Sequence, residues 1–154
     1  MALIEWSREM SVGITELDED HQVLIGIIND LAELQGAEAS AQALRATFEH
    51  LKHYAEFHFA REEAVMRSVR YAVLSDHQVE HRDFESRMRD LSRRLERDPN
   101  RSALEINYEL LHYLKNWLQH HILVIDKDYR PHVEGNLQAE RTAKEFKASH
   151  HWWS

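Results

Sequence analysis

Two histidines four residues apart constrain this chain more than any other feature of its sequence. His77 and His81 form the motif HQVEH. Residues spaced three and four apart share one face of an α-helix, and the apolar residues that continue this spacing are Leu74, Phe84, Met88, Leu91 and Leu95. Both imidazoles are therefore predicted to point into the protein interior, where an unsatisfied polar group costs about 1–3 kcal/mol. Hydrogen-bonded core histidines and a metal site are the two interpretations, and other segments decide between them.

The composition favours one helical domain. A chain of 154 residues is long enough for one domain and short for two, and four Gly and two Pro leave few turns for an all-β fold. The formal net charge of -8, without a basic stripe, argues against a nucleic-acid partner. Because the chain has no cysteine, His and carboxylate side chains must hold any metal. The N-terminus MALIEWSREM lacks a basic start followed by a long apolar run, and no stretch approaches roughly 18–20 apolar residues, so we expect a cytoplasmic protein with no membrane span.

Apolar periodicity predicts an all-α, up-down four-helix bundle. The expected helices cover about residues 19–35, 38–68, 72–97 and 101–127. Asp18 is a candidate cap for the first helix, and Gly36 is expected to end it. An irregular N-terminal arm, residues 1–18, should pack across the end of a bundle domain spanning 1–130, followed by a short helical C-terminal extension, 131–154. The buried face predicted for the fourth helix consists of Leu104, Tyr108, Leu111, Leu114, Leu118, His121 and Ile125.

Polar residues interrupt the buried face of every predicted helix. They are His21, His58, Glu62, His77, His81, His121 and Asp126. Glutamate is almost never fully buried without a partner, so Glu62 strengthens the metal interpretation. Seven ligands are too many for one ion, whereas two bridging carboxylates suit a pair of ions inside a four-helix bundle. Five residues turn an α-helix by about 500°, so Asp126 can share the face of His121 only if a local bulge or helix end intervenes. His120, one residue farther from Asp126, is the poorer ligand candidate.

At this point the chain resembles the hemerythrins, specifically the bacterial single-domain type, over about residues 4–130. The matching segments are IEWSREMSVGITELDEDHQVL, YAEFHFAREEAVM, HQVEH and WLQHHILVIDKDY. The resemblance implies an oxo- or hydroxo-bridged centre of two iron ions. One iron would be bound by His77, His81 and His121 and the other by His21 and His58, with Glu62 and Asp126 bridging.

The same resemblance implies a function. The iron with two histidines would keep an open position, and its apolar neighbours Phe59, Trp117, Leu118 and Ile122 resemble the family's oxygen pocket. The expected activity is reversible dioxygen binding for carriage, storage or sensing, without enzymatic turnover. One alternative is a di-iron oxidase or peroxidase, although ferritin-like sites are richer in carboxylates and use Glu-x-x-His pairs. Another is a signalling module that acts on a protein partner through residues 131–154.

Several positions depart from the family pattern or have two interpretations. Asp20 stands where glutamine often precedes the first histidine, and we expect a solvated side chain there, the alternative being a charge that shifts redox behaviour. Tyr129 is expected to cover the site, and Tyr108 and Tyr113 to lie in the core or around the site. Imidazole and carboxylate ligands also suit manganese, zinc or cobalt, so the ligand set does not by itself fix the metal.

Overall fold

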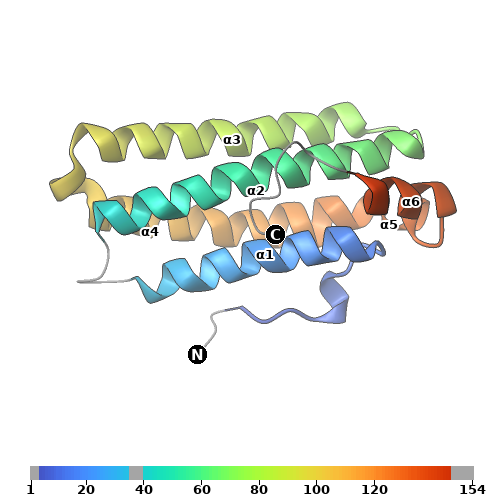
Figure 1. The fold of residues 1–154 in the computed structure, drawn as a ribbon, viewed down its shortest axis with the longest axis horizontal. Coiled ribbons are helices and arrows are strands. Elements are labelled where there is room, and N and C mark those ends of the chain that lie inside the picture. The colour runs from blue at the N-terminus through green and yellow to red at the C-terminus, as the bar shows by residue number, and fades with distance from the viewer. Residues whose placement is uncertain (1–3, 35–39, 147–154) are drawn as a thin grey trace.

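Four long helices run up and down side by side along the length of the molecule (Figure 1). The structure, a computed structural model, describes residues 4–34 and 40–146. Its elements are α1 (Thr15–Glu33), α2 (Ala41–Ser68), α3 (Leu74–Arg97) and α4 (Pro99–Trp117), the last continued by η3 (Leu118–Asp126). The predicted up-down four-helix bundle is confirmed. None of the helices in the described ranges is long and apolar enough to cross a membrane.

The apolar faces predicted for the first three helices form the core of the bundle. Along α3, every residue of the predicted stripe from His77 to Leu95 is buried, and only Leu74 at the helix start is partly exposed. The predicted faces of α1 and α2 are buried throughout. Ser40 caps α2, because its side chain accepts a hydrogen bond from the backbone N–H of Ala43 at 3.1 Å.

The first half of the fourth helix presents a different face from the predicted one. Leu104 and Tyr108 are 46% and 54% exposed, so the expectation that they belong to the core was wrong. The buried series starts one residue earlier, with Ala103, and continues through Ile106, Asn107, Leu110 and Leu114. Two apolar series overlap in this segment, and contact with the neighbouring helices decides which of them is buried. Tyr113 is partly buried and packs against Phe84 and Trp117.

The entry into the first helix also differs from the prediction. α1 begins at Thr15, and Ile14 precedes it without a side-chain cap, so Asp18 does not cap the helix. Asp18 instead lies in the first turn and accepts hydrogen bonds from the N–H of Val12 at 2.9 Å and the hydroxyl of Ser11 at 2.6 Å. This carboxylate ties the N-terminal arm, with its short helix η1 (Arg8–Met10), to the bundle. Gly36 lies outside the described residues.

The predicted irregularity between His121 and Asp126 is a π-helix. All of η3 is wound more widely than an α-helix, with hydrogen bonds from residue i to residue i+5. Wider winding reduces the rotation per residue, so five residues bring Asp126 back to the buried face that also carries His121. The bulge required by the spacing of these two side chains is confirmed.

The residues after the fourth helix pack on the open end of the bundle. α5 (Lys127–Val133) contains Pro131, and a turn at Gly135, which has a φ of 74°, leads into α6 (Leu137–Glu145). α6 lies against α2, and both Ala139 and Ala143 are fully buried there. These small side chains join a second apolar cluster with residues of the arm, α1, α2 and α5. The terminal residues Trp152 and Trp153 lie outside the described ranges.

Candidate metal centre

All seven predicted ligands meet at one end of the bundle. His21 lies near the start of α1, His58 and Glu62 near the end of α2, and the HQVEH pair near the start of α3. The up-down topology brings these three helix ends and η3 together, next to α5 and α6 (Figure 1). Every one of the seven side chains is at most 2% exposed. By contrast, the neighbouring His120 is exposed, in agreement with the choice of His121.

The ligand atoms form two groups that share one carboxylate. The first group combines Glu62 with His77, His81 and His121, and the second combines Glu62 with His21 and His58. Within each group, one ligand atom from every residue lies within 4.8 Å of the others, which is close enough to surround one ion. The division into three and two histidines is the one that the family resemblance implies.

Glu62 turns one oxygen toward each group. Its Oε1 lies 2.8 Å from Nε2 of His81 and 3.1 Å from Nε2 of His77. Its Oε2 lies 3.4 Å from Nε2 of His58 and 3.7 Å from Nε2 of His21. One carboxylate can therefore supply an oxygen to each of two neighbouring ions.

Asp126, at the end of η3, likewise turns one oxygen toward each group. Its Oδ1 lies 2.8 Å from Nε2 of His77 and 3.1 Å from Nε2 of His121, both in the three-histidine group. Its Oδ2 lies 3.3 Å from Nε2 of His21, in the two-histidine group. The π-helix is what places this carboxylate between the two groups, because it returns Asp126 to the inner face.

Several of these buried atoms lack a hydrogen-bond partner, and their placement fits metal ions. Nε2 of His21, His81 and His121 and both carboxylate oxygens of Asp126 make no hydrogen bond of acceptable geometry within the described residues. These atoms lie close to one another, but their geometry does not suit hydrogen bonds between them. Donor atoms that all face one shared ion have this arrangement. Buried polar groups are nearly always paired, so a cluster of unpaired donor atoms indicates a ligand shared among them. The donor set of imidazoles and carboxylates fits divalent transition metals such as iron.

Without metal, the surrounding carboxylates favour protonation of His58 and His77. Burial alone would lower the pKa of His58, but the carboxylates of Glu62 and Asp20 outweigh it and raise that pKa to about 10. Burial likewise opposes protonation of His77, and the close carboxylates of Asp126 and Glu62 raise its pKa to about 10. Despite burial, the surrounding imidazoles hold the carboxyl pKa values of Glu62 and Asp126 below their usual range. Metal ions entering the site must therefore displace protons.

Asp20 is part of the site, which overturns the expectation of a solvated side chain. It is only 2% exposed, and its Oδ2 lies 2.9 Å from Nδ1 of His58. The guanidinium of Arg61 donates to Oδ1 of Asp20 at 3.2 Å and compensates its buried charge. This pairing turns the Nε2 of His58 inward, toward Glu62.

Two further carboxylates, which the sequence did not single out, orient histidines of the other group. Oε2 of Glu63 lies 2.7 Å from Nδ1 of His81, and Oε1 of Glu80 lies 3.1 Å from Nδ1 of His121. Glu63 also accepts hydrogen bonds from Gln78 and Arg82, which keep it in place. Glu63 follows Glu62 in the sequence, and Glu80 precedes His81. This adjacency is only a weak indication that they orient ligands, because charged residues are common on the outer flank of any helix.

The four predicted pocket residues are buried, and two of them stack on predicted metal ligands. The ring of Phe59 stacks on His81 with centroids 3.9 Å apart, and that of Trp117 stacks on His121 at the same distance. Both of these stacks are with the three-histidine group, whereas the resemblance implied a pocket beside the iron with two histidines. In that second group the ring of Phe59 lies 5.8 Å from that of His58. Leu118 and Ile122, 3% and 1% exposed, belong to the same core cluster.

Two tyrosines complete the surroundings of the centre. Tyr129 is fully buried and donates its hydroxyl to Oε2 of Glu62 at 2.9 Å, as expected for a residue that covers the site. Tyr54, which sequence reasoning missed, stacks on His58 with centroids 5.1 Å apart. Burial, together with the negative charges of Asp20, Glu62 and Asp126, raises the pKa of Tyr54 well above 10, so it is a neutral phenol.

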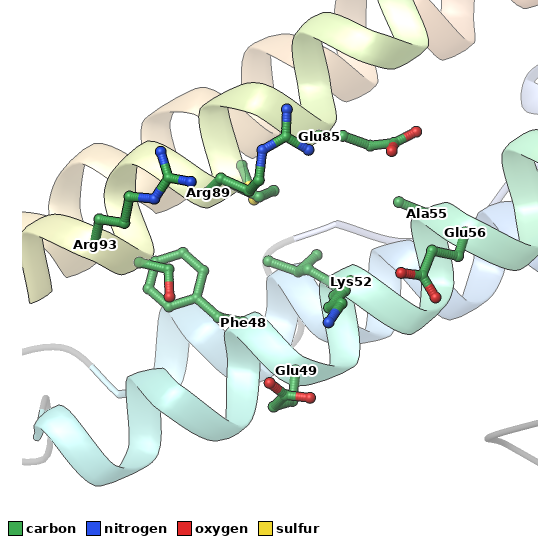
Figure 2. A pocket seen from close by; sticks show the side chains of 11 residues that line it. Phe48, Glu49, Lys52, Ala55, Glu56, Glu85, Arg89 and Arg93 are labelled. Carbon is green, nitrogen blue, oxygen red and sulfur yellow. The ribbon is translucent and has the colours of Figure 1, made fainter. Parts of the chain in front are cut away.

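A surface groove lies elsewhere, between α2 and α3 (Figure 2). Its walls carry charges of both signs, including Lys52 and Glu56 from α2 and Glu85, Arg89 and Arg93 from α3. None of the residues that line this groove is a predicted metal ligand. The candidate centre is thus a sealed cluster inside the bundle, separate from the groove.

Comparison with known proteins agrees with this geometry. Residues 12–133 match the hemerythrin HHE cation binding domain. This chain belongs to the hemerythrin family. A bacteriohemerythrin of Clostridium acetobutylicum is 30% identical over 80% of this chain and 96% of its own length. A myohemerythrin of Theromyzon tessulatum is 28% identical over 82% of this chain and 90% of its own. Crystal structures of hemerythrin variants share the hemerythrin fold with this chain at a TM-score of 0.74 and 23% identity, over 87% of this chain and 99% of theirs.

Proposed function

We propose that this protein binds dioxygen reversibly at a pair of iron ions, as a carrier, store or sensor, and that it is not an enzyme. The observation that carries the proposal is the placement of Glu62 and Asp126. Each of these carboxylates directs one oxygen to the three-histidine half of the cluster and its other oxygen to the two-histidine half. Two iron ions bound there would supply the two electrons that reversible dioxygen binding requires. The names of the relatives, bacteriohemerythrin and myohemerythrin, support this assignment.

The asymmetry of the ligand set supports binding of an external ligand on one side. The three-histidine group offers three nitrogens and an oxygen from each shared carboxylate, whereas the other group offers only two nitrogens with the same oxygens. An ion held by His21 and His58 therefore has one protein ligand fewer than its neighbour. That ion is where a small molecule finds an open position.

The surroundings of the cluster support release of the ligand unchanged. The ligands are at most 2% exposed, and the stacked rings of Phe59 and Trp117 cover one flank. Excluding water limits protonation of the small molecule bound there. Such protonation would release it in a chemically changed form. Reversibility thus depends on this chain keeping the cluster dry.

The test is an optical titration of the anaerobically reduced, iron-loaded protein with oxygen, followed by argon purging and a second titration. We expect two irons per chain and a visible charge-transfer band that appears with oxygen and disappears on purging. His121→Ala should lose iron and the band, whereas His120→Ala, which changes the exposed neighbour, should keep both. Irreversible conversion with consumption of an added reductant would indicate an oxidase. One metal or none per chain would overturn the di-iron proposal.

A further inference from the structure

The hydroxyl of Tyr54 is buried without a hydrogen-bond acceptor. The side chain is fully buried, and no group of the described residues accepts its proton. The other tyrosine at the centre behaves differently, because Tyr129 donates to Glu62 at 2.9 Å. Buried hydroxyls are nearly always paired, so an unpaired one beside a metal site requires an explanation.

Tyr54 lies beside the two-histidine half of the centre. Tyr54 lies one helical turn before His58 on α2, and the two rings are nearly parallel, with an angle of 18° between them. Its edge-on contact with Phe59, at 6.4 Å, fixes the ring from another side. Tyr54 therefore adjoins the two-histidine group, which is the half with one protein ligand fewer.

The hydroxyl of Tyr54 can act as a hydrogen-bond donor here. A neutral phenol donates one proton, and an O–H group aimed at an anionic ligand forms a charge-assisted bond stronger than a neutral one. Neither of the other aromatic rings that stack on the ligand histidines, Phe59 and Trp117, carries a hydroxyl. Of these three stacked rings, only that of Tyr54 carries a hydroxyl.

We propose that Tyr54 donates a hydrogen bond to the small ligand that binds on the two-histidine side, and so favours ligands that can accept one. This inference rests on the proposed function, because it requires an ion with an open position there. It makes Tyr54 a residue that determines ligand selectivity.

The test uses azide as the probe, with oxidised, iron-loaded protein and the Tyr54→Phe variant. Phenylalanine keeps the ring and its stacking on His58 and removes only the hydroxyl. Iron content is measured first, and azide is then titrated by its charge-transfer band. We expect the variant to bind azide roughly 10- to 100-fold more weakly, the range for losing one hydrogen bond to a charged group. Tyr113→Phe, which removes the hydroxyl of a partly buried tyrosine on α4, should bind azide as the wild type does.

Infrared spectra of bound azide in H2O and D2O separate hydrogen bonding from packing. The azide stretch should shift on deuteration in the wild type and in Tyr113→Phe, and the shift should be lost in Tyr54→Phe. Unchanged azide affinity in Tyr54→Phe, or weaker affinity with the deuterium shift retained, overturns the inference while leaving dioxygen binding intact. Wild-type protein without a deuterium shift overturns it independently of any variant. Wild-type protein that holds no pair of irons, or holds them but binds no azide, overturns the proposed function as well.

Discussion

Three of the five ligand histidines have a carboxylate at the far nitrogen of the ring. The pairs are His58 with Asp20, His81 with Glu63 and His121 with Glu80. A carboxylate at Nδ1 holds a proton there, turns Nε2 inward as the nitrogen that binds a metal, and makes the imidazole a stronger ligand once Nε2 has lost its own proton. These outer carboxylates therefore preorganise the ligands before any metal arrives.

Asp20→Asn tests this role at the residue where the chain departs from the family pattern. The substitution removes the charge from the side chain that faces His58 and Arg61, so we expect iron affinity to fall about 10- to 100-fold. Iron affinity is measured by competition with a chelator. Asp30→Asn, which changes an exposed carboxylate on the same helix, is the matched control and should bind iron like the wild type. Equal affinities of the two variants would contradict an orienting role for Asp20.

Hydrophobic periodicity explains which of these residues could be identified from the sequence. Spacing reports the angle of a side chain around its helix, and that is enough to place His21, His58 and His81 on buried faces. Asp20 lies about 100° from His21 around α1, at an angle where a side chain can be solvated or can contact a neighbouring helix. Only the packing of α1 against α2, which brings Arg61 within reach, determines that it is buried. Tyr54 differs, because its spacing of three from Leu51 and four from His58 already indicates the buried face; spacing does not show that its hydroxyl lies unpaired beside His58.

Among the elements, η3 and α6 both lie at the end of the bundle that holds the predicted ligands, η3 carrying two of them and α6 covering α2. The sequence required an irregularity before Asp126, because α-helical winding would point it away from His121. The length of the π-helix was beyond prediction, because the spacing of His121 and Asp126 requires an irregularity without showing where it begins or ends. The same limit explains the error at Leu104 and Tyr108, where two apolar series were equally plausible from spacing alone.

For α6, docking on the bundle predicts a stability effect. Ala143→Glu places a charge in a fully buried position against α2, so we expect the free energy of unfolding to fall by about 1–3 kcal/mol. Chemical denaturation monitored by circular dichroism measures the loss. Lys144→Glu introduces the same side chain at the adjacent exposed position and should change stability by less than about 0.5 kcal/mol. If both variants are equally stable, α6 does not contribute to the core in solution.

Across the whole molecule, the metal-free cluster makes stability depend on pH. The raised pKa values of His58 and His77, both about 10, stabilise the folded state fully below about pH 6.5, the unfolded value, and this contribution is lost as pH rises toward 10. The lowered pKa values of Glu62 and Asp126 contribute above about pH 4.5, and this contribution is lost at lower pH. Metal-free protein should therefore be most stable between about pH 4.5 and 6.5.

Denaturant titrations of metal-free protein at several pH values test this expectation. The free energy of unfolding should fall by at least about 1 kcal/mol between pH 6.5 and pH 10. The iron-loaded protein should behave oppositely below neutral pH, because protons compete with metal for the histidines, so its stability should rise with pH. Proton release on metal addition to an unbuffered solution is an independent measurement. Metal-free stability that is flat from pH 6.5 to 10 would contradict the protonated state of the cluster.

The spread of ligands from residue 21 to residue 126 has a consequence for how the protein is made. During synthesis the chain emerges from its N-terminus, so His21, His58 and the HQVEH pair leave the ribosome before Asp126 does. Asp126 cannot join the two halves of the cluster until η3 has formed and returned to the start of α1. A site filled with two ions would then mark a chain that has folded from α1 through η3.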